Sequence, residues 1–148
     1  MTKSNKQGKQ LVVYSDGGAR GNPGPAGIGV YALLDKKHTF SISEFIGDTT
    51  NNVAEYLAIL RALEYIIAND IVVKEFSFYL DSQLVVKQIK GEYKVKKPHL
   101  QKLNLRTKKL IQHLKTRPEV KKIEFIHITR DKNKEADQQV NDAIDRLI

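Results

Sequence analysis

The stretch Gln10–Asn22 constrains the fold more than any other part of this 148-residue sequence. Leu11 to Tyr14 is a run of apolar, β-branched and aromatic residues. It would leave both faces of a strand apolar, which is typical of a central position in a sheet. Asp16 follows, and glycines come soon after it, where the backbone can turn sharply and approach a ligand closely. The pattern predicts a carboxylate at the edge of a sheet beside an open surface, although Asp and Gly are also ordinary turn residues.

The rest of the chain predicts alternating strands and helices in one α/β domain, residues 10–148, preceded by a polar, flexible arm, residues 1–9. The first three strands follow one another closely enough for an antiparallel meander. The expected strands are 11–14, 26–34, 39–46, 75–80 and 120–129, and the expected helices are 53–68, 82–89, 98–115 and a last one from Asn133.

Three further carboxylates are expected at element ends or first turns, pointing toward the same sheet. Glu55 shares a helical stripe with Ile59 and Ile66 that should face the sheet, where an ionised group is costly unless it is paired or bound to a metal. Asp81 stands where a strand passes into a helix, and Asp137 lies in the first turn of the last helix. Each also has an ordinary interpretation, such as a surface charge favoured by the helix dipole for Glu55 or an N-cap for Asp81.

Four converging carboxylates would repel one another unless some took up protons or a cation lay between them. Oxygen ligands without Cys and without a cluster of His suit Mg²⁺ or Mn²⁺ better than Zn²⁺. Two such ions roughly 3.5–4 Å apart can activate a water and stabilise the leaving oxygen of a phosphodiester. His127, in the fifth expected strand, is better explained as a packed or rim histidine than as a catalyst.

The charge distribution indicates a polyanionic partner. The sequence has a formal net charge of +8 and a pI near 9.6, and residues 82–117 contain eleven Lys or Arg but only one acidic residue. The alternative is a Lys-rich surface that serves only solubility.

Cysteine is absent from the sequence, which excludes disulfides, thiolate metal sites and a Cys nucleophile and suits a reducing cytoplasm. The polar start is expected to be neither a signal peptide nor a membrane anchor, and no later apolar run reaches spanning length.

Four pieces of the sequence resemble type I ribonuclease H, in that family's order and over about residues 11–147. They are Tyr-Ser-Asp16-Gly-Gly-Ala-Arg-Gly-Asn22, Thr50-Asn51-Asn52-Val-Ala-Glu55-Tyr, Leu-Asp81-Ser82-Gln83 and Arg130-Asp-Lys-Asn133-Lys-Glu-Ala-Asp137. The resemblance implies a ribonuclease H-like fold, in which helices flank a five-stranded mixed sheet with strands 1 to 3 antiparallel. It also implies that the four carboxylates hold two Mg²⁺ ions, with Mn²⁺ as a substitute. The implied reaction cleaves the RNA strand of an RNA/DNA hybrid and leaves 3′-hydroxyl and 5′-phosphate ends.

The resemblance also assigns substrate contacts, in a family that separates RNA from DNA by the 2′-hydroxyl group. The RNA strand or the minor groove would face Gly18, Ala19, Gly21, Asn22, Asn52, Glu55 and Gln83. The DNA strand would contact Thr50 and Asn51, while Ser82 and Asn133 would support the carboxylates. Uncharged donors and acceptors suit groove and sugar contacts. Helix and turn capping is the alternative explanation.

The sequence departs from many family members at two places. The loop after the fifth expected strand is shortened to residues 130–132 and lacks a His, so catalysis without that His is expected. A basic, Trp-bearing protrusion is replaced by residues 91–97 alone, as in the compact subgroup of the family. Hybrid binding, which should weaken steeply with salt, is assigned instead to Lys87, Lys90, Lys94, Lys96 and Lys97.

Two other functions remain open from the sequence. A DNA-directed nuclease of the same fold is disfavoured by the absence of appended domains and by the Thr-Asn-Asn and Asp-Ser-Gln pieces. A non-catalytic nucleic-acid-binding module would gain nothing from an anionic cluster beside a polyanion. The expectation is therefore a cytoplasmic monomer that binds RNA/DNA hybrid and needs neither a membrane nor a small-molecule cofactor.

Overall fold

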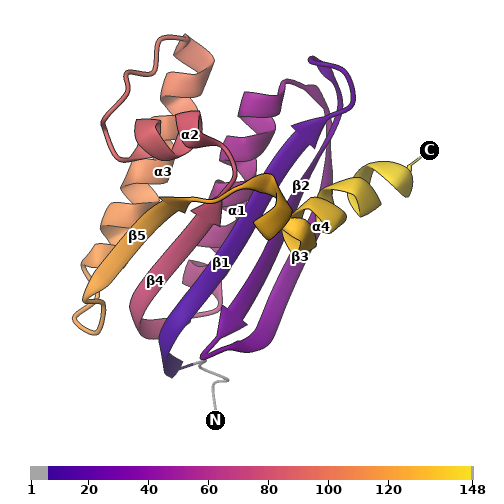
Figure 1. The fold of residues 1–148 in the computed structure, drawn as a ribbon. Coiled ribbons are helices and arrows are strands. Elements are labelled where there is room, and N and C mark those ends of the chain that lie inside the picture. The colour runs from indigo at the N-terminus through magenta and orange to yellow at the C-terminus, as the bar shows by residue number, and fades with distance from the viewer. Residues whose placement is uncertain (1–6, 148) are drawn as a thin grey trace.

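A computed structural model describes residues 7–147, which form one sheet covered by helices on both faces (Figure 1). The strands are β1 (Gln7–Ala19), β2 (Gly24–Leu34), β3 (Lys37–Thr49), β4 (Val72–Leu80) and β5 (Lys122–His127). The helices are α1 (Asn51–Ala68), α2 (Gln83–Ile89), α3 (Pro98–Lys115), the short 3₁₀ helix η1 (Arg130–Lys132) and α4 (Lys134–Asp145).

The sheet has the order β3-β2-β1-β4-β5, so β1 is the central strand, as its apolar run predicts. β1 pairs antiparallel with β2, and β2 pairs antiparallel with β3. β4 lies parallel to β1, and β5 lies parallel to β4. The expected five-stranded mixed sheet with an antiparallel meander is therefore confirmed.

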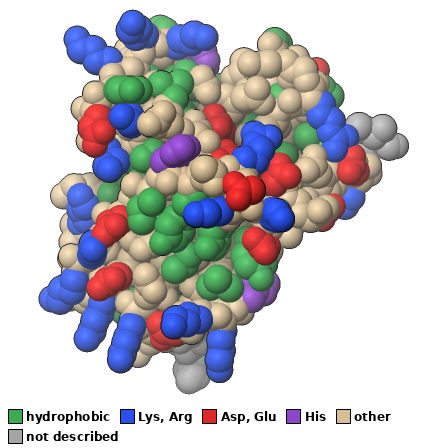
Figure 2. Space-filling model, viewed as in Figure 1, with side chains coloured by type: hydrophobic (Ala, Val, Ile, Leu, Met, Phe, Trp, Pro, Cys, Tyr) green, Lys and Arg blue, Asp and Glu red, His purple; other side chains and the backbone are tan. Residues whose placement is uncertain are grey.

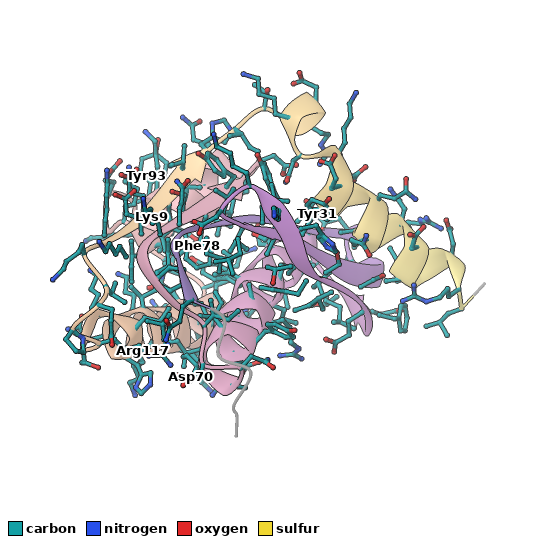
Figure 3. All side chains as sticks on the ribbon, turned by 90° about the horizontal axis from the view of Figure 1, so that it is seen from below. Lys9, Tyr31, Asp70, Phe78, Tyr93 and Arg117 are labelled. Atoms are coloured by element: carbon teal, nitrogen blue, oxygen red, sulfur yellow. The ribbon has the colours of Figure 1, made fainter. Side chains whose placement is uncertain are left out.

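The two faces of the sheet are covered by different helices (Figure 1). α1 and α3 pack on one face and enclose most of the hydrophobic core, in which Phe76 and Phe78 are fully buried. Phe78 lies inside the molecule (Figure 3), with its ring stacked 4.7 Å from that of Phe125. α4 crosses the opposite face over β1, β2 and β3. The start of α4 lies beside Ser15 of β1, whose carbonyl oxygen accepts a hydrogen bond from Asn133.

The glycines after Asp16 do not form the turn that their sequence suggests. β1 continues through Asp16, which pairs with Gly29 of β2, and ends only at Ala19. A Cβ atom at Gly17 would lie 2.2 Å from the backbone of Ala54 in α1, and one at Gly29 would lie 2.1 Å from the carbonyl oxygen of Ala136 in α4. The sharp-turn interpretation is therefore wrong at Gly17, where the missing side chain lets a helix approach the sheet. The chain turns later, near Gly21, whose φ of +90° suits glycine.

Several other boundaries differ from those expected. β1 begins at Gln7, so residues 7–9 belong to a strand and not to the expected arm. Gln7 and Gly8 pair with the start of β4, and the N–H of Lys9 donates to the carboxylate of Asp35. Residues 1–6 and 148 lie outside the described part of the chain. β5 is shorter than 120–129, and η1 was not expected. α3 begins at Pro98 as predicted, and α1 is capped by Thr50, whose Oγ1 accepts a hydrogen bond from the N–H of Val53.

Among residues 7–147, no helix is both long enough and apolar enough to cross a membrane.

Candidate active site

Asp16 and Asp81 are placed next to each other by strand pairing. In the parallel register of β1 and β4, Ser15 lies beside Leu80, so the residue after each is at the same level of the sheet. Asp16 remains within β1, while Asp81 leaves the end of β4. The N-cap of α2 is Ser82 rather than Asp81, because the Ser82 hydroxyl accepts the N–H of Val85 at 3.2 Å. The Asp81 carboxylate is therefore not used in capping α2.

Glu55 and Asp137 approach the same end of the sheet from its two faces. Glu55 lies in the second turn of α1, and its apolar stripe, including Ile59 and Ile66, is buried as predicted. Asp137 lies in the first turn of α4, where Asn141 donates a hydrogen bond to its carboxylate at 3.3 Å. Four segments far apart in the sequence thus bring their carboxylates toward one region.

The pKa values of two carboxyl groups record this crowding. Asp16 is only 6% exposed, and its pKa is raised to about 8, first by burial and then by the charges of Asp81 and Asp137 and a hydrogen bond with Asp137. Burial, followed by the charge of Asp81, raises the pKa of Glu55 to about 7, against the opposing effects of a Ser82 hydrogen bond and the Arg130 charge. Without a cation, these groups resist being ionised together at neutral pH.

Asn133 connects the pieces of this site. Its side chain is fully buried, and its Nδ2 donates to the carbonyl oxygen of Ser15 at 2.9 Å and to Oδ2 of Asp81 at 3.3 Å. Within residues 7–147, its Oδ1 and the hydroxyl of Ser15 have no hydrogen-bond partner. The predicted supporting role of Asn133 rests on these two donated bonds, which tie β1, Asp81 and the start of α4 together.

Arg130 was missed as a site residue. It lies in η1, and its positive charge lowers the pKa values of both Asp16 and Glu55. The sequence does contain a signal for Arg130, because it is the first residue of the family-like segment that ends at Asp137. The 3₁₀ turn is what brings its charge toward the carboxylates.

An open cleft of about 380 Å³ is lined by three of the four carboxylate residues, Asp16, Glu55 and Asp137, but not by Asp81. It is lined by Asp16, Gly17, Gly18, Ala19, Arg20, Asn51, Glu55, Arg130, Asp137, Val140, Asn141 and Ile144. Asn51 and Asn22 shape one wall, because Asn51 accepts the N–H of Ala19 at 2.8 Å and Asn22 accepts the N–H of Asn51 at 3.0 Å. The structure thus gathers Gly18, Ala19 and Asn51 in the cleft beside Asp16, and Asn22 reaches it only through its hydrogen bond with Asn51.

Seven other expected substrate contacts line two other clefts, whereas Gly21 lies in the turn after β1 and Thr50 caps α1. Asn52 lines one of about 500 Å³ together with Lys94, Lys96 and Lys97. Gln83 lines another of about 560 Å³, beside β5, together with Lys87, Lys90 and His127. His127 is exposed at the rim, and Lys and Arg side chains gather on the α2–α3 side of the face in Figure 2. The five lysines assigned to hybrid binding therefore line clefts other than the one that contains Asp16, although α2 starts only two residues after Asp81.

Comparison with known proteins identifies the family. The family model for RNase H matches residues 8–147. The chain belongs to the RNase H family.

The ribonuclease HI of Halobacterium salinarum is 34% identical over 140 residues, covering 94% of this chain and 66% of that protein. The crystal structure of RNase H1 from that archaeon aligns with a TM-score of 0.82, covering 93% of this chain and 98% of the other. A crystal structure of LC11-RNase H1 in complex with an RNA/DNA hybrid aligns with a TM-score of 0.80 at 45% identity, covering 93% and 98% of the two chains. The bifunctional protein Rv2228c of Mycobacterium tuberculosis is 37% identical over 139 residues, and the chain spans only 36% of its length.

The RNase H resemblance drawn from four sequence pieces is confirmed by these matches, as is the fold. The compact form is visible in the connection between α2 and α3, where only residues 90–97 separate Ile89 from Pro98.

The donor set of this RNase H site suits a hard divalent cation, because its ligands would be carboxylate oxygens. Within residues 7–147, however, no three Asp, Glu, His or Cys side chains are arranged to hold one ion. Mg²⁺ is commonly held by one or two carboxylates, with waters and substrate phosphates completing its shell. The pairs formed by Asp16 with Asp81 and by Asp16 with Asp137 fit binding by two carboxylates. A bound cation would offset the repulsion that helps to raise the pKa of Asp16.

Proposed function

We propose that this protein is an endoribonuclease that hydrolyses the RNA strand of RNA/DNA hybrids with two divalent metal ions. The observation that carries the proposal is the approach of Asp81 and Asp137 to the buried Asp16, whose pKa is raised by burial and by the charges of these two neighbours. Asp16 and Asp137 also line an open cleft together with Glu55. Family membership and the hybrid bound by LC11-RNase H1 support the choice of substrate. The proposal includes 3′-hydroxyl and 5′-phosphate products, and a cytoplasmic monomer that needs no small-molecule cofactor.

The residues of the site have distinct proposed roles. Asp16, Glu55, Asp81 and Asp137 hold the ions, and the buried Asp16 must lose its proton to do so. When bound, Mg²⁺ or Mn²⁺ supplies Lewis acidity that activates a water and stabilises the leaving oxygen. Asn133 keeps the carboxylate of Asp81 in place through its 3.3 Å hydrogen bond. Arg130 balances part of the negative charge before substrate arrives.

Recognition of the hybrid is proposed to use groups beside the carboxylates and groups around the two other clefts. The backbone at Gly18, Ala19 and Gly21 and the side chains of Asn22, Asn52 and Gln83 would contact 2′-hydroxyls and the minor groove. The presence of Gly18, Ala19, Asn52 and Gln83 in the walls of open clefts supports this assignment. The polar surface formed by Thr50 and Asn51 would meet the DNA strand. Phosphates would be held by Lys87, Lys90, Lys94, Lys96 and Lys97.

The experiment that tests the function compares labelled RNA/DNA hybrid, RNA/RNA and DNA/DNA duplexes with Mg²⁺, Mn²⁺ or a chelator. We expect cleavage of the RNA strand in the hybrid, requiring a divalent ion and producing 3′-hydroxyl ends. Cleavage of DNA/DNA would indicate a DNA-directed nuclease, and hybrid binding without any cleavage would indicate a non-catalytic module. Either result contradicts the proposal.

Metal-free protein should lose stability as the pH rises. The pKa of Asp16 is raised from 3.8 to about 8 in the folded state, so between about pH 4 and pH 8 the folded protein binds more protons than the unfolded chain. The contribution of the Asp16 carboxyl group to the free energy of unfolding is therefore complete below about pH 4, and it is lost as the pH rises to about 8. Each pKa unit between the two states corresponds to about 1.4 kcal/mol. Urea unfolding in chelator between pH 5 and pH 8.5 measures the effect.

The control for this pH dependence is Asp16→Asn, which cannot ionise at that position. At pH 8 in chelator, we expect Asp16→Asn to be more stable than the parent, and excess Mg²⁺ or Mn²⁺ to stabilise the parent but not the variant. A parent protein whose stability in chelator is flat or rises from pH 5 to pH 8 would show that the carboxylates do not repel one another as described.

The lysines near Asn52 should contribute to hybrid affinity in a salt-dependent way. Lys96→Ala/Lys97→Ala is expected to weaken hybrid binding and to lower the slope of log K against log salt by about 0.7 to 0.9 for each phosphate that the variant no longer neutralises. The matched control is Lys37→Ala/Lys74→Ala, which removes two exposed lysines at the opposite end of the sheet. Fluorescence anisotropy in chelator, over a salt series, measures binding without cleavage. If the slope of log K against log salt is the same for the two double variants, Lys96 and Lys97 do not contact phosphates of the hybrid.

A further inference from the structure

The short helix α2 needs support from the rest of the protein. It has only seven residues, and a helix of this length is not stable by itself in water. Val85, Val86 and Ile89 bury its apolar side. Because α2 begins immediately after Asp81 and Ser82, its position decides where this end of the active site lies.

Three polar side chains are buried where α2 meets α1 and α3. They are Tyr56 on α1, Gln88 on α2 and Asn104 on α3, with exposed fractions of 0%, 6% and 8%. The hydroxyl of Tyr56 donates to Oε1 of Gln88 at 2.7 Å and accepts from Nδ2 of Asn104 at 3.1 Å. The same Nδ2 lies 3.3 Å from the backbone oxygen of Gln88. A single hydroxyl thus joins three helices, using both its donor and its acceptor capacity.

This network lies close in sequence to two proposed metal ligands. It includes the residue after Glu55, and it reaches α2, the helix that follows Asp81. Tyr56 directly follows Glu55 in α1, and Ser82, the cap of α2, makes the hydrogen bond that opposes the rise in the pKa of Glu55. Apolar packing is not directional, so it does not by itself fix how far α2 slides or rotates along α1. Hydrogen bonds have narrow distance and angle ranges and do fix it.

We infer that the Tyr56–Gln88–Asn104 network sets the spacing between Glu55 on α1 and the Asp81–Gln83 segment at the start of α2. Tyr56 is thus a positioning residue, which acts on the site through two helices without touching it. The inference deepens the proposed function and depends on it for its kinetic consequences. Its structural content, that one hydroxyl holds α2 in register with α1, is independent of what the protein cleaves.

The test uses Tyr56→Phe, which removes the hydroxyl and keeps the ring. The matched control is Tyr65→Phe on the same helix, where the ring stacks 4.0 Å from Phe40 and the residue is not part of the Tyr56–Gln88–Asn104 network. The first readout is amide hydrogen exchange and the amide chemical shifts of residues 81–90. We expect α2 amides in Tyr56→Phe to exchange about tenfold faster or more, with α4 and the control unchanged.

The second readout is kinetic. With hybrid as substrate, Tyr56→Phe should lower kcat about tenfold, change KM less than about threefold, and raise the Mg²⁺ concentration for half-maximal rate several-fold. Tyr65→Phe should match the parent in all three quantities.

A second variant separates positioning from stability. Tyr56→Phe/Gln88→Met replaces the hydroxyl and its acceptor by apolar groups of similar size, which removes the buried unpaired oxygen. We expect its melting temperature to return toward the parent value while kcat and the Mg²⁺ requirement stay impaired. Recovery of activity together with stability would overturn the inference, because the network would then be structural only.

Failure of the inference and failure of the proposed function can be told apart. Unchanged exchange and unchanged shifts in residues 81–90 of Tyr56→Phe would overturn the inference whether or not the parent cleaves hybrid. A parent that cleaves no hybrid, but whose α2 loosens in Tyr56→Phe, would overturn the proposed function and leave the register role of Tyr56 supported.

Discussion

Asp81→Asn is expected to abolish hybrid cleavage while leaving hybrid binding nearly intact. The substitution keeps the shape of the side chain and its contact with Asn133 but removes the charge that a divalent cation needs. Losing several kcal/mol of transition-state stabilisation corresponds to a decrease of about 10³-fold or more in kcat. Removing a negative charge beside a polyanionic substrate should not weaken binding. Single-turnover cleavage with Mg²⁺ and anisotropy in chelator measure the two properties separately.

The same variant should change its neighbours in a predictable direction. The charge of Asp81 helps to raise the pKa values of both Asp16 and Glu55, so both should fall in Asp81→Asn, as NMR titration of the carboxyl carbons would record. Asp70→Asn is the matched control, because Asp70 follows the far end of α1 and has a φ of 52°, which Asn accepts. Residual cleavage by Asp81→Asn within tenfold of the parent would refute its role as a metal ligand.

Much of the fold could be predicted because its signals are local. The apolar run at Leu11 marks a central strand, Thr50 and Pro98 mark helix starts, and the stripe through Ile59 marks the buried side of α1. These signals depend on propensity and periodicity within about a dozen residues. Their boundaries were less accurate, because strand ends depend on pairing with partners that a local pattern does not contain.

The candidate site could be predicted as a list of residues but not as a geometry. The sequence predicted the four carboxylates at element ends or first turns, and the register of Ser15 with Leu80 brings two of them to one level. The position of Arg130 depends on a 3₁₀ turn without periodicity, and the link from Tyr56 to Asn104 spans 48 residues. Such contacts arise from packing between elements, which no single stretch of sequence specifies.

The glycines after Asp16 illustrate the same limit. Their composition suggested a turn, because Asp-Gly-Gly is ordinary turn chemistry. In the structure, Gly17 is extended within β1 and lies under Ala54 of α1. At Gly17 the residue type indicated close approach of the backbone correctly, but only the packed structure shows that helix α1 approaches there.

Gly17→Ala is therefore expected to destabilise the protein strongly. The added Cβ would lie 2.2 Å from the backbone carbon of Ala54 and 2.5 Å from the backbone nitrogen of Glu55, so α1 must move away from β1. Overpacking against backbone typically costs about 1–3 kcal/mol, and occasionally more. Because the displaced residue is Glu55 itself, cleavage should fall more than stability alone explains. Urea unfolding at pH 5 and cleavage assays well below the melting temperature measure the two effects.

Gly18→Ala is the control for stability, because it adds the same atom one residue along the same strand. Its Cβ would approach the side chains of Asn51 and Val140 only to 3.9 Å, an ordinary contact distance. The free energy of unfolding of Gly18→Ala should thus stay within about 1 kcal/mol of the parent. Equal destabilisation by the two substitutions would mean that loss of glycine in the strand, and not the approach of α1, determines the effect. In that case the placement of Glu55 would not depend on Gly17.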